Sequence, residues 1–306
     1  MANETQLSWG LCRLRIDACW RAGWTGAGVR VGHLDTGVET THPALGGRVA
    51  SFAEFDAEGT LLSDARPHDT GIHGTHTAGL ICGSAASGQA IGVAPDARLC
   101  SGVVIEGGHV LARVLSGIDW MFDCDVRVVC LSLGIPGYHP LFEVALARLR
   151  QRDVLVVCPI GNGGRAAACS PALYPGVLAV GATDQEDRVA RFSGDGRLRR
   201  GVGAKPSLVA PGAGVLSSEP GGRIGMRDGT SMAAAYVAGV AALLFQARPD
   251  ATVDEVECAL LDSAERLVGV PPERQGCGLV NPLGALQLLL TGAIEPCPYY
   301  SESIRG

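Results

Sequence analysis

The sequence predicts an α/β fold in which a mostly parallel central sheet lies between two layers of helices. Short runs rich in β-branched residues alternate with segments whose apolar residues recur at helical spacing. These runs are apolar almost throughout, as is typical of parallel strands that are covered on both faces. With 306 residues and a hydrophobic content of 47%, the chain is long enough to enclose one large core. These observations favour a single three-layer αβα domain.

The strands and helices can be placed along the chain. Helices are expected at 109–122 and 139–152, where apolar residues recur at helical spacing and arginines occupy the opposite face. The longest apolar run, from Ser231 to Phe245, is typical of a buried core helix, and it is too short and too rich in Ala and Gly for a membrane span. The five expected strands cover residues 29–35, 126–133, 153–160, 177–183 and 207–211.

Two segments rich in Gly and Pro, at 161–176 and 218–229, are expected to be loops. In a parallel sheet, the loops beyond the carboxyl ends of the strands build the functional site. The site is therefore expected where such loops gather at one edge of the sheet.

The charge of the chain argues against a nucleic-acid partner. The net charge is −6, and no segment is rich in Lys or Arg. Phosphate backbones are bound by clustered basic side chains, which this sequence does not supply. With no convincing membrane span either, neither a nucleic acid nor a membrane is expected as a partner.

The eleven cysteines indicate reduced thiols and not a disulfide scaffold. Their number is odd, no two form a C-x-x-C pair, and several lie in apolar runs such as VRVVCLSLG. The amino end lacks the charged start, long apolar core and small-residue cleavage site of a secretory signal. A cytoplasmic location is therefore expected, because thiols stay reduced there.

Three polar residues together match the requirements of one catalytic mechanism. Asp35 ends a strand in LDTG, His73 begins the helical segment HGTHTAG, and Ser231 opens the apolar helix in GTSMA. Singly, each has an ordinary structural explanation as a turn residue, a core histidine or a helix cap. Together, in the order Asp, His, Ser, they match a known catalytic triad order. A hydroxyl attacks, an imidazole takes its proton, and a carboxylate fixes the tautomer of the imidazole.

Asn162 adds a fourth element, because it follows a strand in the segment GNGG. Its amide can donate to the oxyanion of a tetrahedral intermediate, beside the backbone N–H of Ser231. His73 and His76 form an H-x-x-H pattern, but the glutamate of H-E-x-x-H and a third ligand are missing. No metal and no cofactor are expected in the site.

The segments LDTGVETTHP, HGTHTAG, LSLG, GNGG and GTSMA, in this order, resemble the successive signatures of the subtilisin-like serine proteases. The resemblance implies a subtilisin-like fold. It also implies a short N-terminal extension at 1–8, a catalytic domain at 9–290 and a C-terminal tail at 291–306. It assigns the triad to Asp35, His73 and Ser231 and the oxyanion donor to Asn162.

The same resemblance implies where a substrate lies. Two short segments would flank an extended peptide, and a specificity pocket would open next to one of them. The implied substrate-binding residues are Glu106, Gly107, Gly108, Ser132, Leu133, Gly134, Ile160, Gly161 and Cys169. Cys169, at the floor of the pocket, is small and neutral, so an apolar substrate side chain is expected before the scissile bond. Arg165 on the neighbouring loop leaves an acidic preference open.

The sequence departs from the family pattern at positions that would bind calcium. Ala44 and Ala86 stand where many members carry side-chain oxygens, which a hard cation needs. The usual tight calcium site is therefore expected to be absent. Ala235 also stands where members commonly have proline, in the helix that follows Ser231.

The sequence thus predicts an intracellular serine endopeptidase that hydrolyses peptide bonds through an acyl-enzyme on Ser231. One alternative is a leader peptidase, or a transpeptidase or macrocyclase, of a peptide-maturation pathway. Another is a catalytically silent module that only binds peptides. The expected partner is a peptide or protein substrate, and a separate inhibitor or pathway partner fits the short N-terminal extension. The oligomeric state stays open.

Overall fold

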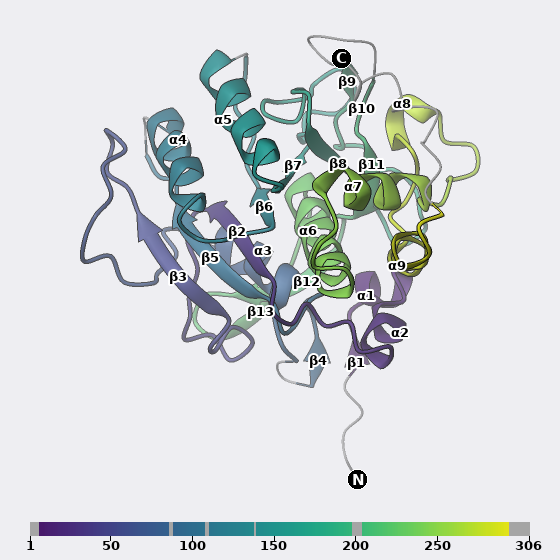
Figure 1. Ribbon diagram of the computed structural model, residues 1–306, viewed down its shortest axis with the longest axis horizontal. Helices are drawn as coiled ribbons and strands as arrows, with labels where there is room; N and C mark the ends of the chain where they lie inside the picture. Colours follow the sequence, from purple (N-terminus) through teal and green to yellow (C-terminus); the bar gives the residue numbers. More distant parts are fainter. Residues whose placement is uncertain (1–5, 86–87, 108–109, 138, 198–203, 294–306) are drawn as a thin grey trace.

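The computed structural model describes residues 6–85, 88–107, 110–137, 139–197 and 204–293. Its centre is a seven-stranded sheet in the order β11-β8-β7-β6-β2-β5-β3, with every neighbouring pair parallel (Figure 1). The strands are β2 (Arg30–Asp35), β3 (Val49–Glu54), β5 (Arg98–Val103), β6 (Val128–Leu131), β7 (Leu155–Pro159), β8 (Val177–Thr183) and β11 (Leu208–Pro211).

Helices cover both faces of this sheet, so the predicted three-layer α/β fold is confirmed. One face carries α4 (Val110–Met121) and α5 (Pro140–Gln151). The other face carries the helices α3 (His73–Cys82), α6 (Thr230–Ala247), α7 (Val253–Asp262) and α9 (Pro282–Thr291), with α1 (Trp9–Arg13) and α2 (Ile16–Arg21) beside them. A short helix, α8, spans Pro272–Gln275.

The central sheet divides the hydrophobic core into two parts, one on each of its faces. On β6, Val128 and Cys130 belong to the core under α3 and α6, whereas Val129 and Leu131 belong to the core under α4 and α5. Successive side chains of a strand point to opposite faces of the sheet. The apolar runs in the sequence follow from this burial on both sides.

Smaller strand pairs border the main sheet. Among the described residues they are β1 (Gln6–Leu7) with β4 (Gln89–Ala90), β9 (Gly196–Arg197) with β10 (Ala204–Lys205), and β12 (Val215–Glu219) with β13 (Arg223–Arg227).

All five predicted strands are present, but the sequence pattern missed β3 and β5. The predicted strand 126–133 ends at Leu131, so Ser132 and Leu133 lie beyond it. The expectation of a loop throughout 218–229 was wrong, because these residues include most of the β12–β13 hairpin. The residues Pro220-Gly221-Gly222 form only the connection between the two strands, and both glycines have positive φ. The sequence pattern therefore mistook the turn residues of a hairpin for a long loop.

The helix α6 runs unbroken for 18 residues through the centre of the protein. It is long and apolar enough to cross a membrane, but 89% of that stretch is buried among other parts of the chain. This burial agrees with the predicted core helix. Ser231 does not cap α6, because the N-cap residue is Gly229 and no side chain makes a cap hydrogen bond there.

Tyr236 fastens α1 to the side of α6. The Tyr236 ring is fully buried, and it fills the space that a side chain at Gly10 would need. A Cβ atom at Gly10 would lie 2.7 Å from Tyr236 Cζ. The close packing of α1 on α6 therefore depends on a glycine at this position.

We predict that Gly10→Ala destabilises the protein by about 1–3 kcal/mol, because the added methyl group overpacks a rigid buried ring. Gly46→Ala is the matched control, since the nearest atom to a Cβ there is 4.0 Å away. Urea unfolding of both variants measures the difference. Equal stabilities of the two variants would contradict this packing.

Candidate active site

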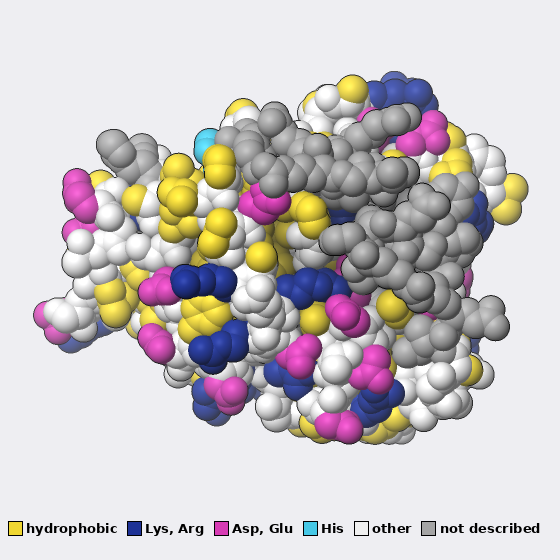
Figure 2. Space-filling model, turned by 45° about the horizontal axis from the view of Figure 1, so that its top comes forward, with side chains coloured by type: hydrophobic (Ala, Val, Ile, Leu, Met, Phe, Trp, Pro, Cys, Tyr) yellow, Lys and Arg dark blue, Asp and Glu magenta, His cyan; other side chains and the backbone are white. Residues whose placement is uncertain are grey.

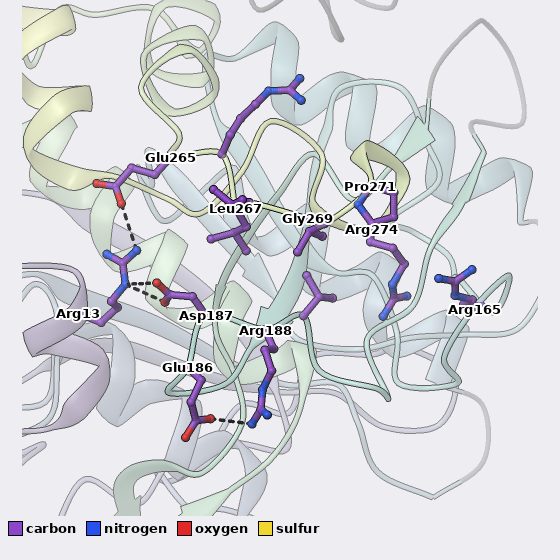
Figure 3. A pocket seen from close by; sticks show the side chains of 14 residues that line it. Arg13, Arg165, Glu186, Asp187, Arg188, Glu265, Leu267, Gly269, Pro271 and Arg274 are labelled. Atoms are coloured by element: carbon purple, nitrogen blue, oxygen red, sulfur yellow. Dashed lines mark hydrogen bonds and ion pairs between the residues drawn. The ribbon is translucent and has the colours of Figure 1, made fainter.

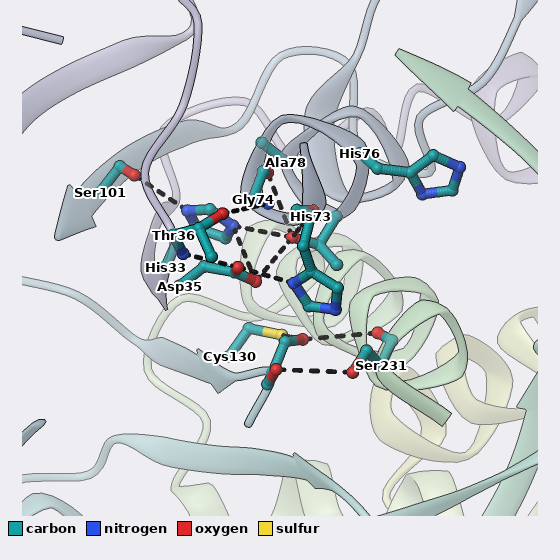
Figure 4. Close-up of polar contacts among 12 residues, drawn as sticks. His33, Asp35, Thr36, His73, Gly74, His76, Ala78, Ser101, Cys130 and Ser231 are labelled. Atoms are coloured by element: carbon teal, nitrogen blue, oxygen red, sulfur yellow. Dashed lines mark hydrogen bonds and ion pairs between the residues drawn. The ribbon is translucent and has the colours of Figure 1, made fainter. Parts of the chain in front are cut away.

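The site forms where α3 lies over the carboxyl end of β2. Asp35 is the last residue of β2, and His73 is the first residue of α3. The Nδ1–H of His73 donates to Asp35 Oδ1 over 2.7 Å. The same oxygen accepts the backbone N–H of Thr36 at 2.7 Å, and Asp35 Oδ2 accepts the hydroxyl of Thr77 at 2.9 Å (Figure 4). The carboxylate is fully buried and held by three donors.

Electrostatics of this pair favour an ionised acid and a basic imidazole. Burial alone would raise the pKa of Asp35, but the charge and hydrogen bond of His73 hold this pKa below its usual value. Burial lowers the pKa of His73, yet the charge of Asp35 and its hydrogen bond outweigh burial and raise this pKa. The pair can therefore stabilise a proton on the imidazole.

Ser231 approaches from a different element. It is the second residue of α6 and is 8% exposed. In Figure 4 the His73 ring points from Asp35 toward Ser231. Ser231 Oγ donates to the carbonyl of Ser132 at 3.4 Å, and no hydrogen bond joins it to His73 in the described structure. Such contacts often tighten only when substrate is bound. The position at a helix N-terminus favours negative charge on the reacting atoms.

Asn162 is held so that its amide nitrogen is available. Its Oδ1 accepts both the backbone N–H and the hydroxyl of Thr230, each at 2.9 Å. The hydroxyl of Thr230 in turn accepts the N–H of Gly161 at 3.2 Å. A Cβ at Gly229 would lie 3.5 Å from Asn162 Nδ2, which places this donor beside the turn that leads into Ser231. The arrangement can offer a hydrogen bond to a developing oxyanion.

The two predicted substrate-binding segments lie on either side of β2. Ser132–Gly134 follow β6, and Glu106–Gly107 follow β5, while β6 and β5 are the two neighbours of β2 in the sheet. The N–H of Ile105 donates to the carbonyl of Asp35 at 3.1 Å, so the second segment begins next to the site. Gly108 lies outside the described residues.

Cys169 lies between the walls of the predicted specificity pocket. A methyl group at Gly134 would be 3.0 Å from Cys169 Cβ, and one at Gly161 would be 3.2 Å from Cys169 Sγ. The N–H of Cys169 donates to the carbonyl of Ile160 at 3.1 Å. The structure thus brings Gly134, Ile160, Gly161 and Cys169 close together, and these are four of the residues that the family resemblance implies for substrate binding.

Arg165 belongs to another part of the surface. It lines a pocket of about 570 Å³ together with Arg188 and Arg274 (Figure 3). The lining of this pocket includes neither Ser231 nor Cys169. Arg165 therefore lines a pocket whose described lining includes none of the residues implied for the specificity pocket.

Sequence reasoning missed a set of polar residues behind the triad. His33, Thr77 and Ser101 are fully buried and hydrogen-bonded to one another or to Asp35. The signal was available in the spacing, because His33 is two residues before Asp35 and Thr77 is four residues after His73. These spacings place residues on one face of a strand and one face of a helix.

At Ala44, one of the two positions where the sequence lacks the usual calcium-binding side chain, the backbone oxygen is already hydrogen-bonded. Ala44 is buried, and its carbonyl accepts both the N–H and the hydroxyl of Ser84, at 2.8 and 3.1 Å. Ala86 lies outside the described residues.

Fold and site together define a three-layer α/β protein with an acid, a histidine and a serine gathered at the carboxyl edge of a parallel sheet. The sequence pattern of the Subtilase family matches residues 26–278. Subtilisin BL of Lederbergia lenta is 37% identical over 275 residues, which cover 89% of this chain and 96% of that protein. Subtilisin E of Bacillus subtilis (strain 168) is 32% identical over 286 residues, which cover 91% of this chain and 71% of the relative.

M-protease of Shouchella clausii (strain KSM-K16) is also 37% identical, over 89% of this chain and 68% of that protein. The chain belongs to the subtilase family. It is a subtilisin-like serine endopeptidase, as the motifs in its sequence predicted.

We predict that kcat/KM rises with pH around a midpoint above 6.5, the ordinary pKa of histidine. Only neutral imidazole accepts the serine proton, and a raised pKa of His73 moves the loss of activity to higher pH. Asp35→Asn removes the charge that raises this pKa, so the midpoint should fall together with the rate. Peptide hydrolysis measured across the neutral range gives both values. A wild-type midpoint below 6.5 would contradict the pairing.

Proposed function

We propose that this endopeptidase acts inside the cell and cleaves peptides through an acyl-enzyme on Ser231. His73 takes the proton of the attacking hydroxyl and then gives it to the leaving amine. Asp35 holds the imidazole in the tautomer that presents Nε2 to Ser231. Asn162 and the backbone N–H of Ser231 stabilise the oxyanion, and water completes hydrolysis of the ester.

One observation carries this proposal more than any other. The buried carboxylate of Asp35 is 2.7 Å from His73 Nδ1, and the ring of His73 points toward Ser231 (Figure 4). A protein that only bound peptides would not need a buried charge aimed at an imidazole, since burying a charge has a large desolvation cost. The arrangement therefore favours catalysis over passive binding.

The state of the cysteines supports an intracellular location. None of the ten cysteines in the described part of the chain forms a disulfide, and seven of them are buried. Their thiols pack as small apolar groups, which suits a reducing compartment. Cell fractionation of the native protein would test this location.

A peptide or protein is the proposed partner, and a nucleic acid or a membrane is not. On the face shown in Figure 2, basic and acidic side chains are mixed and form no single basic field. Leu141 and Val144 on α5 are 61% and 59% exposed, which gives a small apolar area near the substrate side of the sheet. A separate inhibitor or pathway protein is a further proposed partner.

We predict that Ser231→Ala stays folded but is no longer labelled by a fluorophosphonate, because labelling needs a hydroxyl activated by His73. Mass spectrometry of products from a peptide library, with and without an added amine, then shows whether water or the amine accepts the acyl group from the enzyme. Hydrolysed products support an endopeptidase, whereas amide products in the presence of amine identify a transpeptidase. If the folded wild-type protein is never labelled, the remaining interpretation is a module that only binds peptides.

We predict cleavage after apolar residues, such as Leu, Met or Phe. The pocket floor carries the neutral Cys169, and burial of a medium or large apolar side chain stabilises binding by about 1.5–3 kcal/mol. Cys169→Gly should deepen the pocket and shift preference toward the largest of these residues. Arg165→Ala is the control, and it should leave the profile unchanged. A preference for Lys or Arg would overturn the placement of this pocket.

We further propose that stability does not depend on a tight calcium site. Because Ala44 has no side-chain oxygen and its carbonyl is occupied by Ser84, the melting temperature should change little when EDTA is added. A large fall in melting temperature would show that a cation binds elsewhere in the protein.

A further inference from the structure

Behind the proposed triad, a second pair of side chains joins β2 to α3, deeper in the core than Asp35 and His73. Asp35 and His33 lie two residues apart on β2 and thus face the same side of the sheet. His73 and Thr77 lie four residues apart on α3 and thus face the same side of the helix. Asp35 contacts His73, and His33 contacts Thr77 in the same way (Figure 4).

Hydrogen bonds join this inner pair to the catalytic carboxylate. His33 Nε2 is 2.9 Å from Thr77 Oγ1, and Thr77 Oγ1 is 2.9 Å from Asp35 Oδ2. On its other side, His33 Nδ1 is 2.9 Å from the hydroxyl of Ser101, whose residue is the register partner of His33 on β5. All four side chains are fully buried, so water does not compete for these bonds. A continuous chain runs from Ser101 through His33 and Thr77 to Asp35.

The directions of the hydrogen bonds in this chain depend on which atom receives the hydroxyl proton of Thr77. Thr77 has one proton, and three acceptors lie within reach of it: Asp35 Oδ2, the carbonyl of His73 at 3.2 Å and the carbonyl of Gly74 at 3.1 Å. If His33 carries its proton on Nε2, it donates to Thr77 Oγ1, and the hydroxyl remains free to donate to Asp35. If the proton is on Nδ1, the bare Nε2 becomes a fourth acceptor and competes for that hydroxyl.

The charge of Asp35 selects the first tautomer. His33 Nε2 is 3.7 Å from Asp35 Oδ2, and a carboxylate at this distance favours an N–H on the nitrogen that faces it. Burial keeps His33 neutral, because it lowers the pKa of this side chain. Ser101 then donates its proton to Nδ1. Asp69, Asp35 and His73 are the charged or titratable groups that act on His33, and Arg227 also acts on His73.

We propose that His33 is a positioning residue for catalysis: as the Nε2–H tautomer it directs the hydroxyl of Thr77 onto Asp35 Oδ2 and so fixes the carboxylate that orients His73. This role rests on the proposed function of the triad and deepens it. Asp35 is then held on both oxygens, by Thr36 N–H and His73 on one and by Thr77 on the other. A carboxylate fixed at both oxygens cannot rotate away from the imidazole.

The decisive variants change only the hydroxyl. Thr77→Val keeps the shape of the side chain but removes the donor, and kcat should fall about tenfold with KM little changed, as expected for loss of one hydrogen bond to a charged group. Asp35 then has one hydrogen-bond donor fewer, so its charge acts more strongly on the His73 proton. The pH midpoint of kcat/KM should therefore move upward. Thr77→Ser retains the hydroxyl and should restore both values.

Ser217→Ala controls for damage to α3, because the Ser217 hydroxyl is buried and donates to the carbonyl of His76 on the same helix. It should change stability without moving the pH midpoint. If Thr77→Val leaves the midpoint where it was, or if Thr77→Ser loses as much as Thr77→Val, the positioning role is overturned. A wild type without fluorophosphonate labelling would instead overturn the proposed function.

The tautomer can be measured without any activity. Nitrogen-15 NMR of histidine-labelled Ser231→Ala protein, assigned by comparison with a His33→Leu variant, reports which ring nitrogen of His33 bears the proton. We expect a neutral ring with Nε2–H. A neutral ring with Nδ1–H, or a charged ring near neutral pH, would overturn the proposal. His33→Leu and Thr77→Val should also fail to add their losses of kcat in the double variant, since both act on one bond to Asp35.

Discussion

The position of α3 on the end of β2 is the constraint on which the site depends. One hydrogen bond, from His73 to Asp35, joins the first residue of the helix to the last residue of the strand. Neither residue can shift by a turn or a register step without losing it. The helix is fixed in turn by its packing on α6 and β12. The geometry of a small polar pair is therefore determined by large apolar surfaces around it.

The burial of Asp35 explains why so many donors surround it. An ionised carboxylate without partners would be too costly in a core, so each of its oxygens needs hydrogen bonds. Thr36, His73 and Thr77 provide them. His33 adds a second layer, which links the stability of the core to the orientation of the imidazole. Here the polar residues of the core and the chemistry of the site form one network.

The serine side of the site is organised by different means. The helix α6 is apolar nearly throughout, and its first turn presents Ser231 with backbone N–H groups that have no acceptor within the helix. Thr230 joins this turn to Asn162 by two hydrogen bonds, so Asn162 and the serine are positioned by neighbouring residues. Gly134 and Gly161 allow their two segments to approach Cys169 closely.

The sequence alone determined the layers, the five strands with continuous apolar runs, the long helices and the residues of the proposed triad, because these depend on local periodicity and on short motifs. It did not reveal β3 and β5, whose patterns mix polar and small residues, or the β12–β13 hairpin, whose turn residues resembled a loop. Only the tertiary structure brought His33, Thr77 and Ser101 together behind Asp35. Their contact depends on strand register and helix placement, which are set by packing between segments that lie far apart in the chain.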